Sequence, residues 1–140
     1  MTLHIDIRTD TAFLNVLATG KFSLKEAQRT FLEVLEAVGS HHLKKVIIDG
    51  REVIGKPETI ERFYYGKFVA NSIKAYKTRG VSGATAFAYV INEPLLDRQR
   101  FGETVAVNRG AHVRAFDNME AAFKWLEIAP PHHASADRAA

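Results

Sequence analysis

From Phe13 onward the sequence alternates between short apolar runs and longer amphipathic segments, and this alternation constrains the fold more than any other feature. The runs have the length of strands and the longer segments carry helix-start patterns, which is the order of a parallel sheet whose strands are joined by helices. Earlier, residues 3–8 alternate apolar and polar side chains and a short polar link joins them to 12–18, so a hairpin opens the chain. We predict an α/β fold with the order β-β-α-β-α-β-α-β-α, a mostly parallel sheet and an antiparallel first strand.

Helix start and stop patterns divide the chain further. Ser23 and Glu26 form a capping-box pattern, in which each side chain can bond the other residue's backbone N–H, and Gly39 is expected to end that helix in the left-handed conformation. Asn92 is expected to cap a later helix, and a second capping-box pattern places the last helix after Asp117. The expected helices are 23–39, 59–77, 93–108 and 119–127, and the expected later strands are 44–50, 84–91 and 111–116.

Length and composition indicate one globular domain. A chain of 140 residues falls in the size range of a single core, and its hydrophobic fraction of 46% is enough to form one. We expect this domain over residues 1–128 and a flexible tail over 129–140, where no apolar periodicity continues. The chain has no cysteine, so it can form neither a disulfide nor a thiolate nucleophile nor a thiolate metal site.

Charge and hydropathy argue against several functions. The formal net charge of +3 is far below the clustered positive charge that nucleic-acid binding needs. The chain opens without a basic segment followed by an apolar run, and no apolar stretch approaches about 18 residues, so we predict a cytoplasmic protein without stable membrane insertion. Because no nucleophile beside a base, carboxylate pair or metal triad is legible, we also predict that the protein is not an enzyme and uses no cofactor or metal.

One candidate site lies where the central strand is expected to end. Asp49 closes the apolar run 44–50, and Arg51 and Lys56 follow it in the place where open α/β sheets often bind ligands. The helix expected to begin at Thr59 would add backbone N–H groups and a positive dipole end, which suits an anion. In the alternative interpretation, Asp49 caps a turn and the two basic side chains are solvated.

The helix that follows carries more aromatic side chains than one buried stripe can hold. Successive helical residues turn by about 100°, so these rings must point in several directions and some should remain at a surface. The four aromatics that we single out are Phe63, Tyr64, Tyr65 and Phe68. They favour a homodimer face, a partner groove or the mouth of a site for an apolar ligand, because large exposed apolar patches usually mark contacts. In the alternative interpretation they lie half buried beneath neighbouring helices.

Four stretches of the sequence resemble the SpoIIAA-like branch of the STAS proteins, a group that includes anti-sigma-factor antagonists and the soluble ends of sulfate transporters. The stretches are ATGKFSLKEAQRTF, KKVIIDGREV, ATAFAYVINE and HVRAFDNMEAAFKWL. The resemblance covers residues 2–128 and implies a sheet covered by helices, with a regulatory surface at the loop after the central strand. The same architecture recurs in Sec14-like lipid carriers, which is an analogy of fold.

The chain departs from that family at the regulatory loop. Antagonists of the family present Asp-Ser there, where phosphorylation of the serine adds charge and blocks partner binding. This chain has Asp49-Gly50-Arg51-Glu52 instead, with no hydroxyl beside the aspartate. The resemblance therefore implies a relative that lacks the usual phosphoserine switch.

These observations predict a non-enzymatic binding or regulatory module that acts through protein contacts, as a homodimer or with a partner protein. The alternative is a carrier or sensor of a small apolar or amphipathic, lipid-like ligand, which the Sec14-like analogy and the aromatic excess favour. A partner module predicts an exposed aromatic patch and no cavity, whereas a carrier predicts a cavity of roughly 300 Å³ or more lined by the same side chains. The residues expected to bind partner or ligand are Asp49, Arg51, Lys56, Thr59, Phe63, Tyr64, Tyr65 and Phe68.

Overall fold

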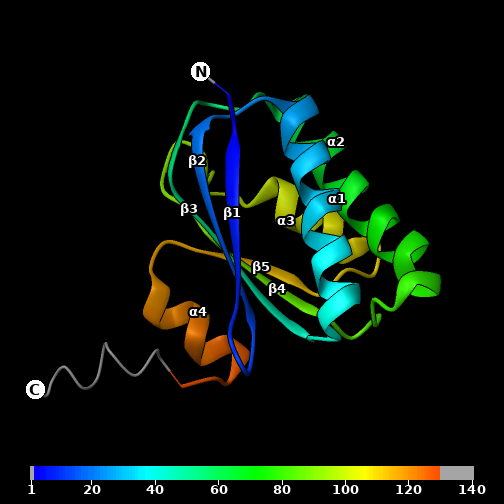
Figure 1. The fold of residues 1–140 in the computed structure, drawn as a ribbon. Coiled ribbons are helices and arrows are strands. Elements are labelled where there is room, and N and C mark those ends of the chain that lie inside the picture. The colour runs from blue at the N-terminus through cyan, green and yellow to red at the C-terminus, as the bar shows by residue number, and fades with distance from the viewer. Residues whose placement is uncertain (1, 130–140) are drawn as a thin grey trace, which may run out of the picture.

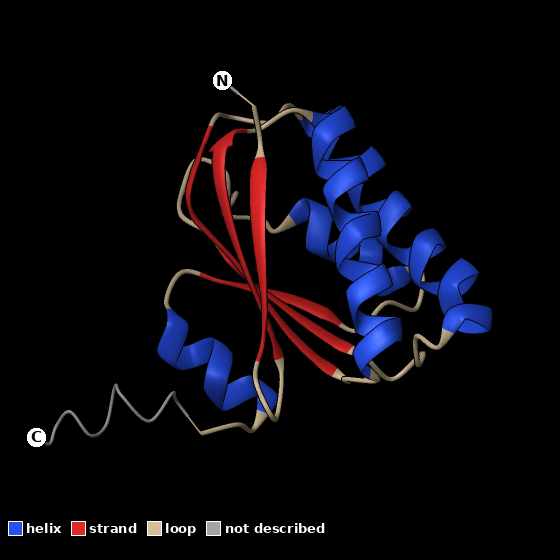
Figure 2. Ribbon diagram, viewed as in Figure 1, coloured by secondary structure: helices blue, strands red, loops and turns tan. Residues whose placement is uncertain are grey.

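A five-stranded sheet with helices on both faces forms the protein, as the computed structural model of residues 2–129 shows (Figure 1; Figure 2). The strands lie in the order β1-β2-β3-β4-β5, with β1 antiparallel to β2 and the later pairs parallel. The strands are β1 His4–Thr9, β2 Leu14–Lys21, β3 Lys45–Ile54, β4 Ala86–Val90 and β5 Val113–Phe116. The helices are α1 Leu24–His41, α2 Thr59–Ala75, the short 3-10 helix η1 Tyr76–Arg79, α3 Phe101–Asn108 and α4 Met119–Leu126. The predicted α/β class, element order and antiparallel first strand are confirmed, while the predicted tail from 130 onward lies outside the described residues.

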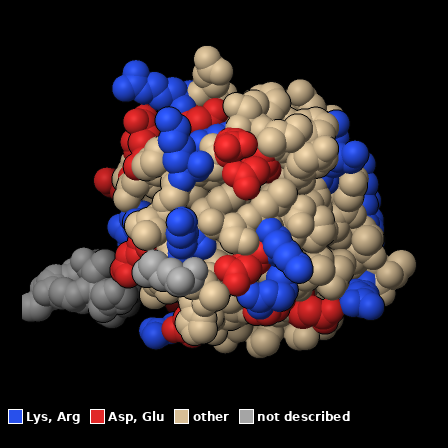
Figure 3. Space-filling view, turned by 90° about the horizontal axis from the view of Figure 1, so that it is seen from above, with Lys and Arg blue, Asp and Glu red and all other residues tan. Residues whose placement is uncertain are grey.

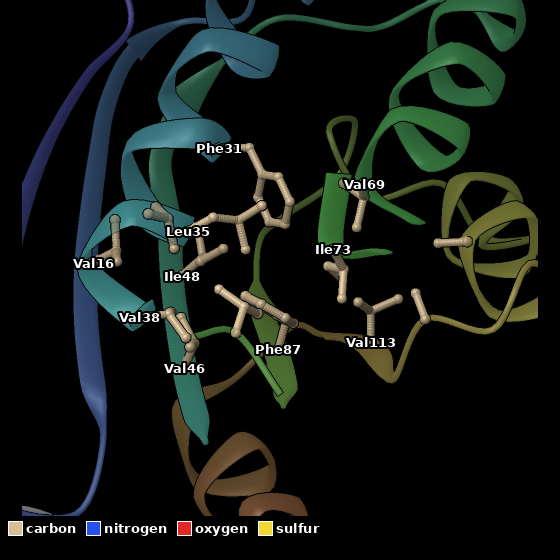
Figure 4. Close-up of a cluster of buried hydrophobic side chains, with 14 of the residues drawn as sticks. Val16, Phe31, Leu35, Val38, Val46, Ile48, Val69, Ile73, Phe87 and Val113 are labelled. Atoms are coloured by element: carbon tan, nitrogen blue, oxygen red, sulfur yellow. The ribbon is translucent and has the colours of Figure 1, made fainter. Parts of the chain in front are cut away.

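The helices form two unequal layers. Helices α1, α2 and α3 cover one face of the sheet, and α4 alone covers part of the other (Figure 1). On the larger side, Phe31, Leu35 and Val38 stand on successive turns of α1 and point onto the sheet (Figure 4). On the smaller side, Phe13 and Phe123 meet edge to face with ring centroids 5.7 Å apart. The three-helix layer therefore encloses most of the apolar core.

The central strand β3 explains why its sequence reads as an unbroken apolar run. Val46 and Ile48 face the three-helix layer, whereas Ile47 faces α4, so neighbouring residues are buried on opposite faces. The expected end of this strand at Gly50 is wrong, because β3 continues to Ile54 beside the end of β2. Pairing passes from Leu17 with Asp49 to Thr19 with Glu52, so β3 carries one more residue than β2 across this bulge.

Both ends of α1 show how tertiary contacts modify local patterns. The Ser23 hydroxyl accepts the backbone N–H of Glu26 at 3.3 Å, as predicted. The Glu26 carboxylate does not complete the capping box but accepts the backbone N–H of Leu3 at 2.9 Å, which ties α1 to the first strand. The expected helix stop at Gly39 is wrong, since α1 runs to His41 and His42 takes the left-handed conformation. Gly39 is instead a close contact, where a Cβ would lie 2.4 Å from the carbonyl oxygen of Arg79.

The segment between β4 and α3 is the largest departure from prediction. A helix was expected from 93 onward, but regular structure resumes only at Phe101. The carbonyl oxygens of Pro94 and Leu95 accept hydrogen bonds from the guanidinium of Arg62 at 2.9 and 2.6 Å, which ties this irregular segment to α2. The carboxylate of Asp97 accepts the backbone N–H of Phe101 and marks the true start of α3.

The last helix begins at Met119, as predicted, but its capping residue lies one position after the expected one. Asn118, not Asp117, is the N-cap of α4, and its side-chain oxygen accepts the backbone N–H of Ala121 at 2.8 Å. Both residue types can cap a helix, so the sequence pattern alone could not choose between these neighbours.

Candidate functional site

A cavity of about 180 Å³ lies between the sheet and the three-helix layer. It is reached by residues from the second halves of the parallel strands, such as Val53, Tyr89 and Ala115, so it extends to their carboxyl ends. This is the edge where open α/β sheets usually hold ligands. Its walls are predominantly apolar, as is typical of small-molecule sites.

Small residues on the covering helices keep this space open. Ala27 of α1, Gly66 of α2 and Ala106 of α3 all line the cavity. Helices α2 and α3 meet at a glycine pair, because a Cβ on Gly66 would lie 2.5 Å from the carbonyl oxygen of Gly102. The helices therefore approach each other closely while leaving little side-chain volume to fill the space beside the sheet.

Two tyrosines place the main polar group in the cavity wall. The hydroxyls of Tyr65, from α2, and Tyr89, from β4, are 2.8 Å apart and hydrogen-bonded. Burial raises the pKa of Tyr65 to about 12 and also raises the pKa of Tyr89. The ring of Tyr65 meets those of Tyr89 and Phe31 edge to face, which fixes its orientation. Both phenols are therefore neutral and held in place at ordinary pH.

Arg62 ties α2 to the irregular segment that forms one side of the cavity. Its guanidinium donates to the carbonyl oxygens of Pro94 and Leu95 and lies 3.7 Å from a carboxylate oxygen of Asp97. Only 13% of the Arg62 side chain is exposed, so this charge is compensated inside the protein. Because Arg62, Leu95 and Asp97 all line the cavity, the tether closes that side.

A second charged pair completes the polar edge of the cavity. The guanidinium of Arg100 lies 3.2 Å from the carboxylate of Glu103 and also donates to the carbonyl oxygen of Ala115. The same carboxylate oxygen of Glu103 accepts the backbone N–H of Ala115 at 3.1 Å. This pair joins α3 to β5, and neither charge is left without a partner.

The predicted site at Asp49 is partly self-contained. Both carboxylate oxygens of Asp49 accept from the guanidinium of Arg51 at 2.9 Å, and the ion pair raises the pKa of Arg51 above its usual value. Asp49 lies within β3 rather than at its end, and Lys56 and Thr59 are exposed farther along. The structure thus brings Asp49 and Arg51 together as an ion pair. Lys56 lies in the loop after β3, and Thr59 is the first residue of α2.

The start of α2 already carries negative charge. The carboxylate of Glu61 accepts the backbone N–H of Glu58, which is the N-cap residue. These acids occupy the helix end that an anion was expected to approach. On the face seen in Figure 3, basic and acidic side chains are interspersed rather than gathered by sign. Anion binding near Thr59 stays a prediction.

The four aromatics of α2 divide between the interior and the surface. Tyr65 turns inward and lines the cavity. Tyr64 is 48% exposed, Phe63 is partly buried beneath the guanidinium of Arg109, and Phe68 is partly buried against the core. Ile60, Tyr64 and Phe68 follow one another at four-residue spacing, so they form one face of α2 that we call the α2 strip.

The sequence patterns did not single out most of the residues of the cavity. They singled out Tyr65 but not Arg62, Tyr89, Asp97 or Glu103. The available signal was the strand 84–91, in which small residues alternate with aromatics and imply close contact with covering helices on one face. Asp97 and Glu103 look like ordinary surface charges in the sequence, because only the fold brings them to the cavity.

Two kinds of site are not found within residues 2–129. No helix there combines the length and apolar character needed to cross a membrane. No group of three or more histidine, aspartate or glutamate residues in the same part of the chain is placed to hold a metal ion.

Comparison with known proteins identifies the fold. No family model matches the chain, and no curated protein sequence matches it. The crystal structure of an anti-sigma factor antagonist from Mycobacterium paratuberculosis superposes with a TM-score of 0.60 at 12% identity, over 90% of this chain and 95% of that one. An uncharacterized protein with a SpoIIAA-like fold from Shewanella loihica superposes with a TM-score of 0.47 at 16% identity, over 89% and 93% of the two chains. The chain therefore shares its fold with that anti-sigma factor antagonist.

Proposed function

We propose that this protein is a non-enzymatic binding module that holds a small, largely apolar molecule in the cavity between its sheet and its three-helix layer. The observation that carries the proposal is the cavity itself, which is apolar, lies at the ligand-binding edge of the sheet and includes a fixed polar pair. The protein would act as a carrier or sensor of that molecule in the cytoplasm.

The volume of the cavity limits the size of the ligand. At about 180 Å³ it is smaller than the roughly 300 Å³ expected of a site for a drug-sized or lipid-like molecule. An apolar cavity of about 150 Å³ in another protein is known to bind benzene. We therefore propose a ligand of one ring or a comparably short chain, in place of a lipid-like one.

Titration with toluene, followed by the backbone amide signals in NMR, tests this proposal. We expect saturable shifts at cavity residues such as Val69, Tyr89 and Ala106. The variant Ala27→Leu places three more carbon atoms in the cavity and should weaken toluene binding at least about tenfold, because the ligand and the new side chain compete for one space. The matched control Ala75→Leu makes the same change at an exposed position of α2 and should bind toluene like the wild type.

Two results would contradict the proposal. The first is a wild-type protein whose amide signals do not shift saturably. The second is binding that Ala27→Leu leaves unchanged while its spectrum shows a folded protein, since the ligand would then lie elsewhere.

The α2 strip supports a second candidate function, which is contact with a protein partner or a second copy of this chain. Ile60 and Tyr64 are 52% and 48% exposed, and exposed apolar side chains that share a helix face are typical of contact surfaces. The structural neighbour that is named an anti-sigma factor antagonist favours a regulatory role of this kind. The aspartate-glycine run at Asp49 makes such a role independent of a phosphoserine at that position.

The two candidates are compatible because they share a helix. Tyr64 on the α2 strip and Tyr65 in the cavity are consecutive residues that point about 100° apart, so a ligand and a partner would touch different sides of α2. Sedimentation velocity over a concentration series tests self-association. We expect a dimer that Ile60→Ser with Tyr64→Ser weakens and that Lys124→Ser, at an exposed position of α4 on the other face of the sheet, does not. A wild-type chain that stays monomeric at the highest concentration would contradict the homodimer.

The predicted anion site near Asp49 is tested separately. If Arg51 and Lys56 bind an anion, replacing both with alanine should abolish the shifts that inorganic phosphate causes in the amide signals around Thr59. Unchanged shifts, or no shifts in the wild type, would reject that site.

A further inference from the structure

We propose that the cavity selects uncharged molecules that carry one hydrogen-bond acceptor on an apolar body, such as small ketones or ethers, and that the hydroxyl pair of Tyr65 and Tyr89 recognises the acceptor. This inference rests on the proposed function, because it assigns a chemical class to the ligand of the same cavity.

The tyrosine pair has one hydroxyl hydrogen that its own hydrogen bond does not use. Each tyrosine hydroxyl has one hydrogen, and the bond between Tyr65 and Tyr89 uses one of the two. Neither hydroxyl has another hydrogen-bond partner among residues 2–129. One O–H hydrogen therefore has no acceptor among these residues, and a partly buried donor without a protein acceptor favours a ligand that supplies one.

Both phenols of the tyrosine pair are uncharged at neutral pH. Burial raises the pKa of both phenols, so at neutral pH both keep their hydrogens and neither carries charge. The pair can donate one hydrogen bond outward but offers no charge to balance an ionic ligand.

The charged side chains around the cavity are already paired with one another or with backbone groups. The guanidinium of Arg62 contacts two carbonyl oxygens and the carboxylate of Asp97, and Arg100 is paired with Glu103. A carboxylate ligand would have to compete with these internal partners, and an ammonium ligand would have to displace a guanidinium. Burying an unpaired charge costs far more than burying a paired one, so both classes are disfavoured.

Arg114 also reaches the cavity edge but points its charge elsewhere. Its guanidinium carbon lies 5.6 Å from the ring centroid of Phe116, and Phe116 packs against the cluster beneath α4. The charge of Arg114 is thereby drawn toward the opposite face of the sheet, and the tyrosine pair is left as the group that can discriminate between ligands.

Two probes of nearly equal shape test the assignment. Cyclohexanone has a carbonyl oxygen where methylenecyclohexane has a CH₂ group, so only the ketone can accept a hydrogen bond. Both are titrated into wild type and into the double variant Tyr65→Phe with Tyr89→Phe, and dissociation constants are taken from the amide shifts. The double variant is required because either single variant frees the remaining hydroxyl to donate to the ligand.

We expect the double variant to weaken cyclohexanone binding about three- to tenfold, which corresponds to one net hydrogen bond, and to leave methylenecyclohexane within about twofold. Each single variant should keep most of the ketone affinity. Tyr76→Phe removes a hydroxyl that bonds Glu36 outside the cavity, so it should change neither constant. Amide spectra and thermal unfolding confirm that each variant is folded.

The outcomes separate this inference from the proposed function. If both probes bind the wild type and the double variant equally, the cavity holds ligands but the tyrosine pair does not recognise an acceptor, and the inference is wrong. If cyclohexanecarboxylate or cyclohexylammonium binds more tightly than cyclohexanone, the uncharged class is wrong. If no probe binds the wild type, the proposed function fails and the inference fails with it.

Discussion

The two ends of the helix-covered face of the sheet are built differently although the same strands and helices form both. At the amino ends of the parallel strands, Leu35, Val38, Val46 and Phe87 are fully buried and fill the space between the layers. At the carboxyl ends, a cavity of about 180 Å³ lies between the layers. Its lining includes small residues of the covering helices, Tyr65 of α2 and Tyr89 of β4. We call these regions the solid end and the hollow end.

This difference teaches that the fold does not need the hollow end to be filled. Interiors are normally packed to crystal-like density, and unfilled space costs stability. The small side chains of Ala27 and Ala106 leave a volume that a ligand can occupy. Under the proposed function, the solid end supplies stability and the hollow end holds the ligand.

The largest expected effect compares two residues on β4. Phe87 is fully buried in the solid end, and Tyr89 follows on the same face in the hollow end. We expect Phe87→Ala to lower the free energy of unfolding by about 3–5 kcal/mol, because it creates a cavity in a packed region. Tyr89→Phe should cost at most about 1.5 kcal/mol, because it removes only one hydrogen bond. Urea unfolding measures the free energy of unfolding of both variants. Equal losses would show that the two ends do not differ in packing.

A smaller effect is expected at the helix contact that shapes the hollow end. Gly66→Ala would place a Cβ 2.5 Å from the carbonyl oxygen of Gly102, so α3 must shift away from α2. The better helix propensity of alanine offsets part of the strain, and we expect a net loss of about 1–2 kcal/mol with weaker toluene binding. Asn71→Ala, at an exposed position of the same helix, should change the free energy of unfolding by less than about 0.5 kcal/mol. A stabilised Gly66→Ala with intact binding would show that the glycine contact does not shape the cavity.

The third comparison is a pH dependence that arises at the hollow end. Tyr65 has a pKa of about 12 in the folded protein and an ordinary value near 10 when unfolded, so the unfolded chain loses this proton first as the pH rises. The unfolded state then binds fewer protons, and stability falls with pH between about 10 and 12 and is unaffected below about 10. We expect Tyr65 to contribute a loss of about 1.4 kcal/mol per pH unit in that window. Tyr89, whose pKa is also raised, adds a loss of the same sign, so the slope is reduced but not abolished in Tyr65→Phe. Parallel pH profiles for both proteins would exclude this origin.

Much of the fold could be predicted because its signals are local. The continuous apolar run of β3 indicates burial on both faces, and Ser23 caps α1 through atoms three residues apart. The errors arose where a distant partner decides. Gly39 lies in close contact with the carbonyl oxygen of Arg79. The segment after β4 is hydrogen-bonded to Arg62, which lies in α2. A pattern that compares only neighbouring residues cannot reveal contacts between residues far apart in the sequence.

The candidate site was harder to predict for the same reason. The cavity takes its lining from the sheet and from three helices, so no single stretch carries a motif. The excess of aromatics on α2 singled out this helix, and Tyr65 is the one of the four selected rings that lines the cavity. Its partner Tyr89 looks like an ordinary strand residue until the fold brings the two hydroxyls to 2.8 Å.

Diffraction from crystals pressurised with xenon would test the central claim most directly. Xenon enters apolar cavities of this size without needing a hydrogen bond, so it reports the hollow end independently of ligand chemistry. The account predicts one dominant xenon peak among Val69, Tyr89 and Ala106, absent in Ala27→Leu. A side-chain arrangement that closes the space, or a cavity occupied by hydrogen-bonded water with no xenon peak, would contradict it.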